Sequence, residues 1–384
     1  MDKIYVDNAA TTKLDNEVLK KMLPFLSESY GNPSSLYSLG RETKEAINEA
    51  RINVAKVLNC ESNEIYFTSG GSESNNAALK CIAFSLKKIG KHIITSNIEH
   101  PSVLESCKFL ESIGFEISYI DVNKEGIIKL DELQKAIRKD TILISIMFAN
   151  NEIGTIQPIE EIGKIAHKNN IVFHTDSVQA VGSLNIDVKK MNIDLLSMSA
   201  HKFYGPKGVG ALYINKKTKI LPYINGGHQE NNMRAGTENV ASIVGLGEAI
   251  KLAYSDLEKH NKQITNLREY YFSELEKIIN IKINGDRTNR LPGNTNVSIP
   301  DIDSEALIYN LDKNNICASS GSACNSGTNI LSHVLQAIGS NEKEITSSVR
   351  ITFGKYNTKE EIDIIIKVLK DLVSKLSLNN GTGK

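Results

Sequence analysis

The sequence predicts an α/β fold in which helices cover both faces of a mainly parallel, seven-stranded sheet. Apolar, strand-like runs recur along the chain, and stretches with helical patterns separate the first five of them. This alternation is typical of parallel sheets, because each parallel connection needs a crossover that usually forms a helix. The runs lie near residues 64–68, 92–96, 116–120, 141–148, 171–174, 193–198 and 209–214.

The pattern changes after about residue 239, which predicts a second, smaller α/β domain. Long helical patterns extend to about residue 279, and short strands follow at 295–299 and 349–353. A chain of 384 residues is long enough for two domains. The predicted division is residues 1–15 as an N-terminal arm packed with the small domain, 16–255 as the large domain and 256–384 as the small domain.

The first strand, near residues 65–68, leads into a Gly-Gly turn and a serine that opens a helix, Ile65-Tyr-Phe-Thr-Ser-Gly-Gly-Ser72. Backbone N–H groups at such a helix start point toward an anion. Gly71 and Ser72 are therefore candidates for holding a phosphate. The alternative is that they only turn the chain and cap the helix.

The second strand, residues 92–96, is followed by His100, directly before a helix that starts near Pro101. An imidazole at this edge of the sheet can stack on a ring and exchange protons near neutral pH. Position alone distinguishes His100 from the other histidines, since most of the eight are expected at the surface or in satisfied structural contacts.

The fifth run ends in an acid, Asp176, after Ile171-Val-Phe-His-Thr. A carboxylate at the end of a buried strand can pair with a protonated pyridine nitrogen and keep the ring electron-poor. An ordinary helix N-cap is the alternative for an aspartate in this position.

The sixth run ends in Ser199-Ala-His-Lys202, which places a lysine at the end of a buried element. A buried ammonium loses its hydration, and this favours the neutral amine that condenses with an aldehyde. Lys202 is therefore a candidate for the lysine that binds pyridoxal phosphate as a Schiff base, although a solvated lysine is the ordinary alternative. Asp176 and Lys202 follow successive parallel strands and should meet at one sheet edge, where α/β proteins bind ligands.

Further motifs extend over nearly the whole chain. They are Tyr5-Val-Asp-Asn-Ala-Ala-Thr-Thr12, Tyr30-Gly-Asn-Pro-Ser-Ser35, Phe67-Thr-Ser-Gly-Gly-Ser-Glu-Ser74, Asn150-Asn-Glu-Ile-Gly154, His174-Thr-Asp-Ser-Val-Gln-Ala180, Ser199-Ala-His-Lys-Phe-Tyr-Gly-Pro-Lys-Gly208, Arg234-Ala-Gly-Thr-Glu-Asn239, Arg290-Leu-Pro-Gly-Asn294 and Ser319-Ser-Gly-Ser-Ala-Cys324. In this order they resemble the cysteine desulfurases, pyridoxal phosphate enzymes of fold type I that are related to class V aminotransferases.

The resemblance implies a cofactor role for each matching position. Lys202 would carry pyridoxal 5′-phosphate, Asp176 would pair with its pyridine nitrogen, and Gln179 would approach the ring hydroxyl. The residues implied to hold the phosphate are Gly71, Ser72, Ser199 and His201, with Thr237 reaching it from the opposite subunit of a homodimer.

The resemblance also implies how the substrate, L-cysteine, is bound. Asn151 would lie near the ring and the substrate, and His100 would move protons. Arg350 would bind the substrate carboxylate through its planar fork of N–H donors. The alternative for Arg350 is a structural ion pair.

Cys324 lies in a Gly- and Ser-rich run without a large apolar anchor, which predicts a mobile surface loop at residues 319–331. A thiol on an accessible loop can act as a nucleophile. The other cysteines are expected to be small hydrophobes, which is the usual role of the residue; they are Cys60, Cys81, Cys107 and Cys317.

The implied reaction converts L-cysteine to L-alanine. Lys202 removes the Cα proton, the Cys324 thiolate attacks the substrate sulfur, and the resulting persulfide passes to an acceptor protein. An iron-sulfur scaffold is the expected acceptor, ahead of tRNA-thiolation and thiamin-pathway proteins. No intrinsic metal site is expected, although Cys324 would be able to ligate a cluster transiently together with such a scaffold.

Other activities remain open at this stage. A selenocysteine lyase or another class V aminotransferase-like enzyme would keep Lys202 and Asp176. An aminotransferase would have no general need for Cys324. A non-enzymatic sulfur-transfer scaffold is less well supported, because the catalytic set looks complete.

Composition agrees with an enzyme in a reducing compartment. The formal net charge is zero, with 45 residues of each sign, so no general attraction to nucleic acid or membrane is expected. Five cysteines without a CxxC pair argue against a disulfide framework and a zinc ribbon. The sequence shows no signal peptide and no apolar run near the roughly 20 residues that span a bilayer, so a cytoplasmic location is expected.

Overall fold

A seven-stranded sheet forms the centre of the larger lobe in the computed structural model, which describes residues 3–320 and 331–381. The strand order is β2-β8-β7-β6-β5-β3-β4, and β8 runs in the direction opposite to that of the other six described strands. The predicted, mainly parallel sheet is therefore confirmed. Its strands are β2 (Ile65–Thr68), β3 (His92–Ser96), β4 (Glu116–Ile120), β5 (Thr141–Ser145), β6 (Val172–Asp176), β7 (Leu195–Ser199) and β8 (Gly210–Ile214).

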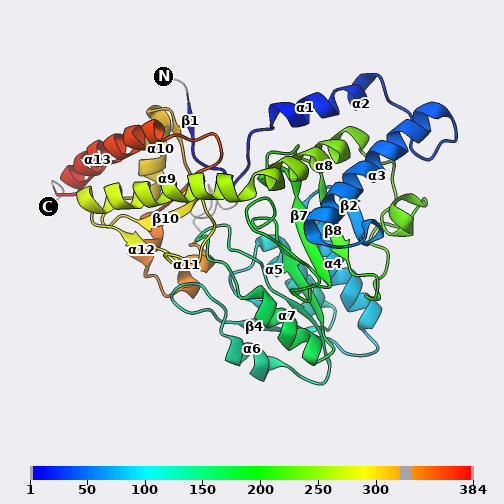
Figure 1. Ribbon diagram of the computed structural model, residues 1–384. Coiled ribbons are helices and arrows are strands. Elements are labelled where there is room, and N and C mark those ends of the chain that lie inside the picture. Colours follow the sequence, from blue (N-terminus) through cyan, green and yellow to red (C-terminus); the bar gives the residue numbers. More distant parts are fainter. Residues whose placement is uncertain (1–2, 321–330, 382–384) are drawn as a thin grey trace.

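Helices cover both faces of this sheet (Figure 1). Successive strand residues point to opposite faces, so Ile94 and Ile144 enter one apolar core while Ile93 and Leu143 enter the other. The first core is completed by α1 (Asn16–Met22), α3 (Ser38–Leu58), α6 (Leu130–Ala136), α7 (Ile159–Lys168) and α8 (Val240–Ser255). The second core is completed by α4 (Gly71–Leu86) and α5 (Pro101–Ser112).

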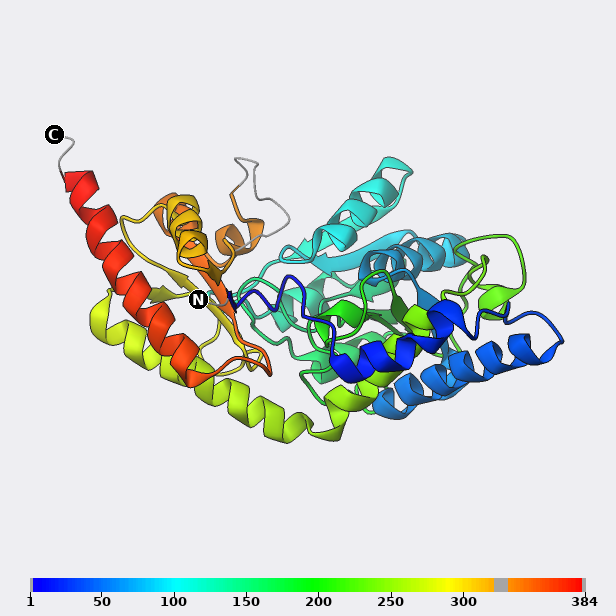
Figure 2. The ribbon, with the colours of Figure 1, turned by 90° about the horizontal axis from the view of Figure 1, so that it is seen from above.

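The smaller lobe has its own sheet and its own core, to one side of the large sheet (Figure 2). Its antiparallel strands, in the order β12-β10-β9, are β12 (Ser348–Thr352), β10 (Asn294–Ser298) and β9 (Lys282–Ile283). Its helices are α9 (Leu257–Ile278), α10 (Ser304–Lys313), α11 (His333–Ala337), α12 (Glu342–Thr346) and α13 (Lys359–Gly381).

The division of the chain between residues 255 and 256 stays a prediction, because α9 contacts both lobes. Near its start, Asn261 Nδ2 donates a hydrogen bond of 2.7 Å to the carbonyl of Ser183 in the large lobe. Further along, Tyr271 and Phe272 are buried in the core of the small lobe. The helix therefore crosses the junction between the two lobes.

The N-terminal segment also joins the two lobes (Figure 2). β1 (Ile4–Tyr5) pairs in parallel with β11 (Ile316–Cys317) in the small lobe. The chain then passes to the large lobe, where the Thr12 backbone N–H donates to the carbonyl of His201 at 2.9 Å. Residues 7–12 consequently lie between the small-lobe sheet and the end of β7.

None of the helices in residues 3–320 and 331–381 combines the length and apolarity that a membrane crossing requires.

Candidate active site

A cavity of about 370 Å³ lies where the strand ends of the large sheet face the small lobe. Most of the residues selected from the sequence line it, namely Gly71, Ser72, His100, Asn151, Asp176, Gln179, Ser199, His201, Lys202 and Arg350. Thr237 does not line this cavity and is exposed on the same subunit. Cys324 lies outside the described residues. The fold therefore brings together ten of the twelve predicted site residues.

The order of the strands explains this convergence. From β3 the chain moves outward to β4 and then returns to place β5 on the other side of β3. The segments that follow β3 and β5 therefore diverge, and such a divergence at the carboxyl ends of parallel strands opens a ligand crevice. His100 follows β3, Asn151 follows β5, and Asp176 ends β6.

Lys202 ends a short 3₁₀ turn, Ala200–Lys202, that directly follows β7. Its Nζ donates hydrogen bonds to the carbonyls of Ala9, at 2.6 Å, and Ala10, at 2.7 Å. The side chain is half-buried and lines the cavity. The amine thus lies inside the crevice and against the N-terminal segment, a partner that the sequence pattern did not identify.

Asp176 is buried, and neighbouring donors fix its carboxylate. Oδ1 accepts a hydrogen bond from the Val178 backbone N–H at 3.0 Å, and Oδ2 accepts one from Asn75 Nδ2 at 2.7 Å. Asn75 also donates to Ser102 Oγ at 2.9 Å. Asn75 was missed in the sequence, since nothing about an asparagine in a predicted helix indicates a partner 101 residues away.

His100 is the N-cap of α5, and its ring is held by the first turn of that helix. Nδ1 accepts a hydrogen bond from the Ser102 backbone N–H at 3.1 Å. Burial lowers the pKa of His100; the carboxylate of Asp176 opposes this change, and Lys202 and His333 add to it. The imidazole is therefore neutral near pH 7, and because Nδ1 acts as an acceptor, its proton is on Nε2.

The start of α4 forms an anion cradle. The first N–H groups of a helix lack partners within the helix and attract anions. Gly70 precedes α4 at φ 151° and ψ −176°, a conformation open essentially to glycine. A Cβ on Gly71 would lie 2.5 Å from Val178 Cγ2, so only glycine fits there without displacement of its neighbour.

Ser199 and His201 approach the same cradle from the end of β7. With Gly71 and Ser72 they also line a shallower hollow that adjoins the cavity. Nδ1 of His201 lies 3.0 Å from Thr11 Oγ1. Burial, together with the charges of Lys202 and Lys207, lowers the pKa of His201 to about 4, so its ring is neutral at pH 7. A neutral imidazole can donate one hydrogen bond to a phosphate.

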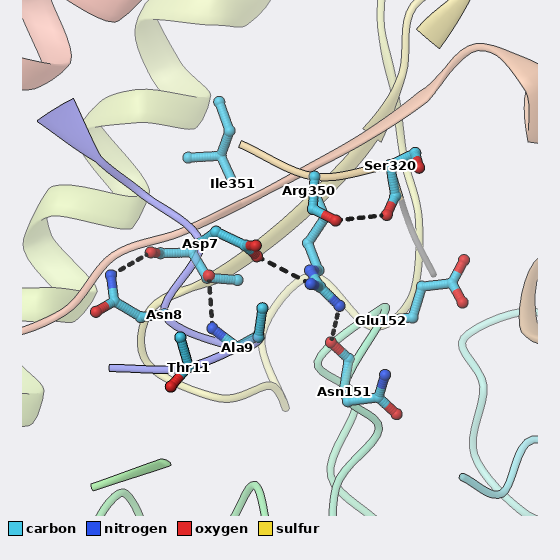
Figure 3. A network of polar contacts seen from close by, with 12 residues as sticks. Asp7, Asn8, Ala9, Thr11, Asn151, Glu152, Ser320, Arg350 and Ile351 are labelled. Atoms are coloured by element: carbon cyan, nitrogen blue, oxygen red, sulfur yellow. Dashed lines mark hydrogen bonds and ion pairs between the residues drawn. The ribbon is translucent and has the colours of Figure 1, made fainter. Parts of the chain in front are cut away.

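Arg350, in β12, forms the wall of the cavity on the side of the small lobe (Figure 3). Its Nη2 pairs with Asp7 Oδ1 at 2.9 Å, and its Nη1 donates to the carbonyl of Asn151 at 3.0 Å. Gln179, on the opposite side, donates through Nε2 to the carbonyl of Ala9 at 3.0 Å. Arg350 thus makes the structural ion pair considered in the sequence and also lines the cavity, as substrate binding requires.

Two buried acids of the cavity wall, Glu99 and Glu152, were not selected from the sequence. Burial raises the pKa of Glu99 to about 8, and its Oε1 accepts hydrogen bonds from Ser96 Oγ and the Met147 N–H. Burial also raises the pKa of Glu152 to about 7, although a hydrogen bond from Ser332 Oγ (2.6 Å) and the charge of Arg350 oppose the rise. Each acid adjoins a selected residue, but their burial depends on tertiary packing.

The cavity fits pyridoxal 5′-phosphate at three separate points. An amine, Lys202, is available for its aldehyde, and a fixed carboxylate, Asp176, for its pyridine nitrogen. Gly71 and the neutral His201 suit its phosphate. Gly71 lines both the cavity and the adjoining hollow, so the backbone at the helix start is accessible to an anion.

Comparisons with known proteins agree with this arrangement. The family model described as aminotransferase class-V matches residues 4–365. The chain is 54% identical over 375 residues to "Cysteine desulfurase IscS" of Dictyoglomus turgidum, covering 97% of this chain and 95% of that protein. A solved structure named "NIFS-LIKE PROTEIN" is 40% identical, with a TM-score of 0.92 and coverage of 97% and 99% of the two chains. A structure titled "SspA in complex with cysteine" is also 40% identical, with a TM-score of 0.82 and coverage of 92% and 100%.

Proposed function

Since the chain belongs to the class V aminotransferase family and, within it, to the cysteine desulfurases, we propose that it converts L-cysteine to L-alanine and passes the sulfur through Cys324 to an acceptor protein. The observation that carries this proposal is a single cavity that holds a lysine, a strand-end carboxylate, an anion cradle and a buried arginine. The related structure that is titled as a complex with cysteine supports the same substrate.

Pyridoxal 5′-phosphate, the cofactor of this family, supplies when bound an electron-poor ring that absorbs the negative charge left at the substrate Cα. Lys202 would hold the cofactor through its amine. Asp176, oriented by Asn75 and the Val178 N–H, would keep the pyridine nitrogen protonated. Gly71, Ser72, Ser199 and His201 would bind the phosphate, and Gln179 would approach the ring hydroxyl.

The proton steps are assigned to two side chains. Lys202 would take the proton from the substrate Cα once its amine is released by the incoming amino group. His100 would act in proton movement through Nε2, because its imidazole is neutral near pH 7 and its one proton is on that nitrogen, so Nε2–H is the group that it would offer to the substrate. Asn151 and Arg350 would hold the substrate, with the guanidinium of Arg350 on its carboxylate.

The sulfur step is assigned to Cys324, which lies outside the described residues. Its thiolate would attack the sulfur of the bound cysteine, so that an S–S bond forms while the substrate C–S bond breaks. The electron pair of that bond stays on the substrate carbon, which takes up protons and leaves as alanine. The enzyme then carries a persulfide that an acceptor thiol can remove by the same kind of exchange.

We also propose a homodimer, in which Thr237 completes the phosphate site of the partner subunit. Thr237 is exposed, and its segment is held beside the start of α4 by the ion pair between Arg234 and Glu73, at 2.9 Å. Residues 19–37, elsewhere in the large lobe, expose several large apolar side chains. They are Leu19, Leu23, Leu26, Tyr30, Leu36 and Tyr37. Clustered exposed apolar residues are typical of an interface between proteins, and a second copy of the chain would cover them.

An iron-sulfur scaffold is our proposed acceptor, and tRNA-thiolation and thiamin-pathway proteins are its competitors. A selenocysteine lyase is the second candidate activity, because it would use the same cofactor site. The two activities differ in their requirement for Cys324. A lyase acting on L-selenocysteine has no general need for this thiol, whereas a desulfurase that forms a persulfide depends on it.

Alanine formation from L-cysteine by the wild type and by Cys324→Ala tests the proposal. We expect the variant to lose roughly 100-fold or more of its turnover while L-cysteine still changes the visible absorption of the bound cofactor. Cys317→Ala is the matched control, because this half-buried thiol lies in β11 and should be dispensable. Undiminished turnover in Cys324→Ala would contradict the persulfide route and favour a lyase or an aminotransferase.

A further inference from the structure

We propose that Asp7 is a positioning residue for substrate selection, which holds the guanidinium of Arg350 in the orientation that receives the α-carboxylate of an amino acid. This inference rests on the proposed function, because it assigns the carboxylate of L-cysteine to Arg350. Asp7 acts through Arg350 rather than on the substrate itself. The proposal follows from the contacts of the guanidinium and from the way in which Asp7 is anchored.

Two chain segments hold the guanidinium of Arg350 at its two terminal nitrogens (Figure 3). Asp7 Oδ1, from the N-terminal segment, pairs with Nη2 at 2.9 Å, and the carbonyl of Asn151, which follows β5, accepts from Nη1 at 3.0 Å. A planar group held at both terminal nitrogens cannot rotate about its last bond without losing a contact. Arg350 also lines the cavity, where a guanidinium held in this way can face a carboxylate.

The ion pair between Asp7 and Arg350 is largely shielded from water. The side chain of Arg350 is 2% exposed and that of Asp7 is 17% exposed. Charge-assisted hydrogen bonds are stronger in such surroundings than at the surface, where water and salt weaken them. Removal of the Asp7 carboxylate should therefore leave the guanidinium free to reorient. At the surface, by contrast, water would replace the lost contact at little cost.

The backbone on either side of Asp7 is fixed to the strand that carries Arg350. The Thr352 N–H donates to the carbonyl of Val6 at 2.7 Å, and the Ala9 N–H donates to Thr352 Oγ1 at 2.9 Å. Tyr5 Oη also donates to the carbonyl of Asp7 at 3.0 Å. Asp7 and Arg350 therefore move as parts of one unit, and the acid is held in place before any substrate arrives.

The side-chain contact of Asp7 is separable from the contacts that the same segment makes to the cofactor site. The carbonyl of Ala9 meets Lys202 and Gln179, and Thr11 Oγ1 lies beside His201. These contacts involve backbone carbonyls and a different side chain. A substitution of Asp7 should therefore alter carboxylate binding while leaving cofactor binding intact.

Two ligands that differ in the carboxylate test the inference, and both are measured through their effect on the visible absorption of the bound cofactor. L-cysteine carries the α-carboxylate, and cysteamine is the same molecule without it. In Asp7→Ala we expect the half-saturating concentration of L-cysteine to rise about tenfold or more, while that of cysteamine changes less than twofold. KM for L-cysteine should rise more than kcat falls. Asp7→Asn, which keeps an oxygen acceptor for Nη2 but loses the charge, should recover part of the lost affinity.

Asn8→Ala is the matched control. Its amide also docks the segment onto β12, by donating to the carbonyl of Thr352 at 2.7 Å, and its second contact is with Asn357 Oδ1, at 3.4 Å. We expect this variant to be less stable than the wild type. Its half-saturating concentrations for L-cysteine and cysteamine should change by the same factor.

The inference would be overturned if Asp7→Ala lost affinity for L-cysteine and cysteamine by the same factor. It would also be overturned if Asp7→Ala bound L-cysteine as tightly as the wild type or more tightly. Failure of the proposed function would be distinguishable, since the wild type would then form no alanine. The comparison of ligands with and without a carboxylate could still be made on such a protein, because it requires binding and not turnover.

Discussion

The Glu99→Gln variant tests whether the buried acid beside His100 is held in its neutral form. The side chain of Glu99 is fully buried in the cavity wall. Its Oε1 accepts hydrogen bonds from Ser96 Oγ at 2.6 Å and from the Met147 N–H at 2.9 Å. Glutamine has nearly the same shape and keeps this oxygen, so the substitution removes the ability to ionise and little else.

The magnitude follows from the pKa of Glu99, which burial raises from 4.5 to about 8. Because the folded state binds this proton more tightly than the unfolded state, the stability that the neutral acid contributes is complete below about pH 4.5 and is lost as the pH rises through about 8. The difference between these pKa values corresponds to about 5 kcal/mol. A chain of 384 residues has an unfolding entropy of roughly 0.8 kcal/mol per degree, so the complete effect amounts to about 6 °C in Tm, and about 5 °C of it falls between pH 5 and pH 8.5.

Thermal unfolding of the wild type and Glu99→Gln at pH 5 and pH 8.5 measures this effect. We expect Tm of the variant, relative to that of the wild type, to be about 5 °C higher at pH 8.5 than at pH 5. Glu105→Gln is the control, since Glu105 is an exposed carboxylate on α5 that pairs with Lys108. If the difference in Tm between variant and wild type were the same at both pH values, the folded protein would not favour the neutral form of Glu99.

Two further substitutions test the cofactor site. Asn75→Leu removes the donor to Asp176 Oδ2 and should weaken retention of pyridoxal phosphate about tenfold, measured by visible absorption after dialysis, because the buried carboxylate loses a charge-assisted hydrogen bond. Asn76→Ala, at the half-buried neighbouring position, should retain the cofactor, and equal retention by both variants would refute the role of Asn75. Gly71→Ala places a methyl group 2.5 Å from Val178 Cγ2 and should displace the helix start, so the dissociation constants for free phosphate and for the cofactor should both rise. If neither dissociation constant changed, Gly71 would not be part of the anion cradle.

The site residues that were predicted without the family resemblance share one property, which is that their positions follow from local patterns. Lys202 and Asp176 stand at the ends of apolar runs, and the carboxyl ends of parallel strands meet at one edge. Lys202 and Asp176 meet in this way if the two apolar runs form strands, and both runs do, as β6 and β7. The strand order, which opens the crevice between β3 and β5, depends on long-range pairing that local patterns do not specify.

The residues that sequence reasoning missed depend on contacts between distant segments. Asp7 and Arg350 are separated by 343 positions, and Asn75 and Asp176 by 101. The burial of Glu99 depends on the segment around Met147, which follows β5 and whose N–H donates to Glu99 Oε1. Local patterns of ten or twenty residues contain no information about such distant pairs. Only the three-dimensional structure therefore shows which residues hold the site residues in place.

The attachment site of the cofactor tests the account most directly. Reduction of the holoenzyme with borohydride fixes pyridoxal phosphate to the lysine that carries it, and peptide mass mapping then identifies that lysine. We expect the modified residue to be Lys202, whose side chain lines the cavity together with Asp176 and the anion cradle. Modification of another lysine, such as Lys207 beside the phosphate end of the cavity, would contradict it.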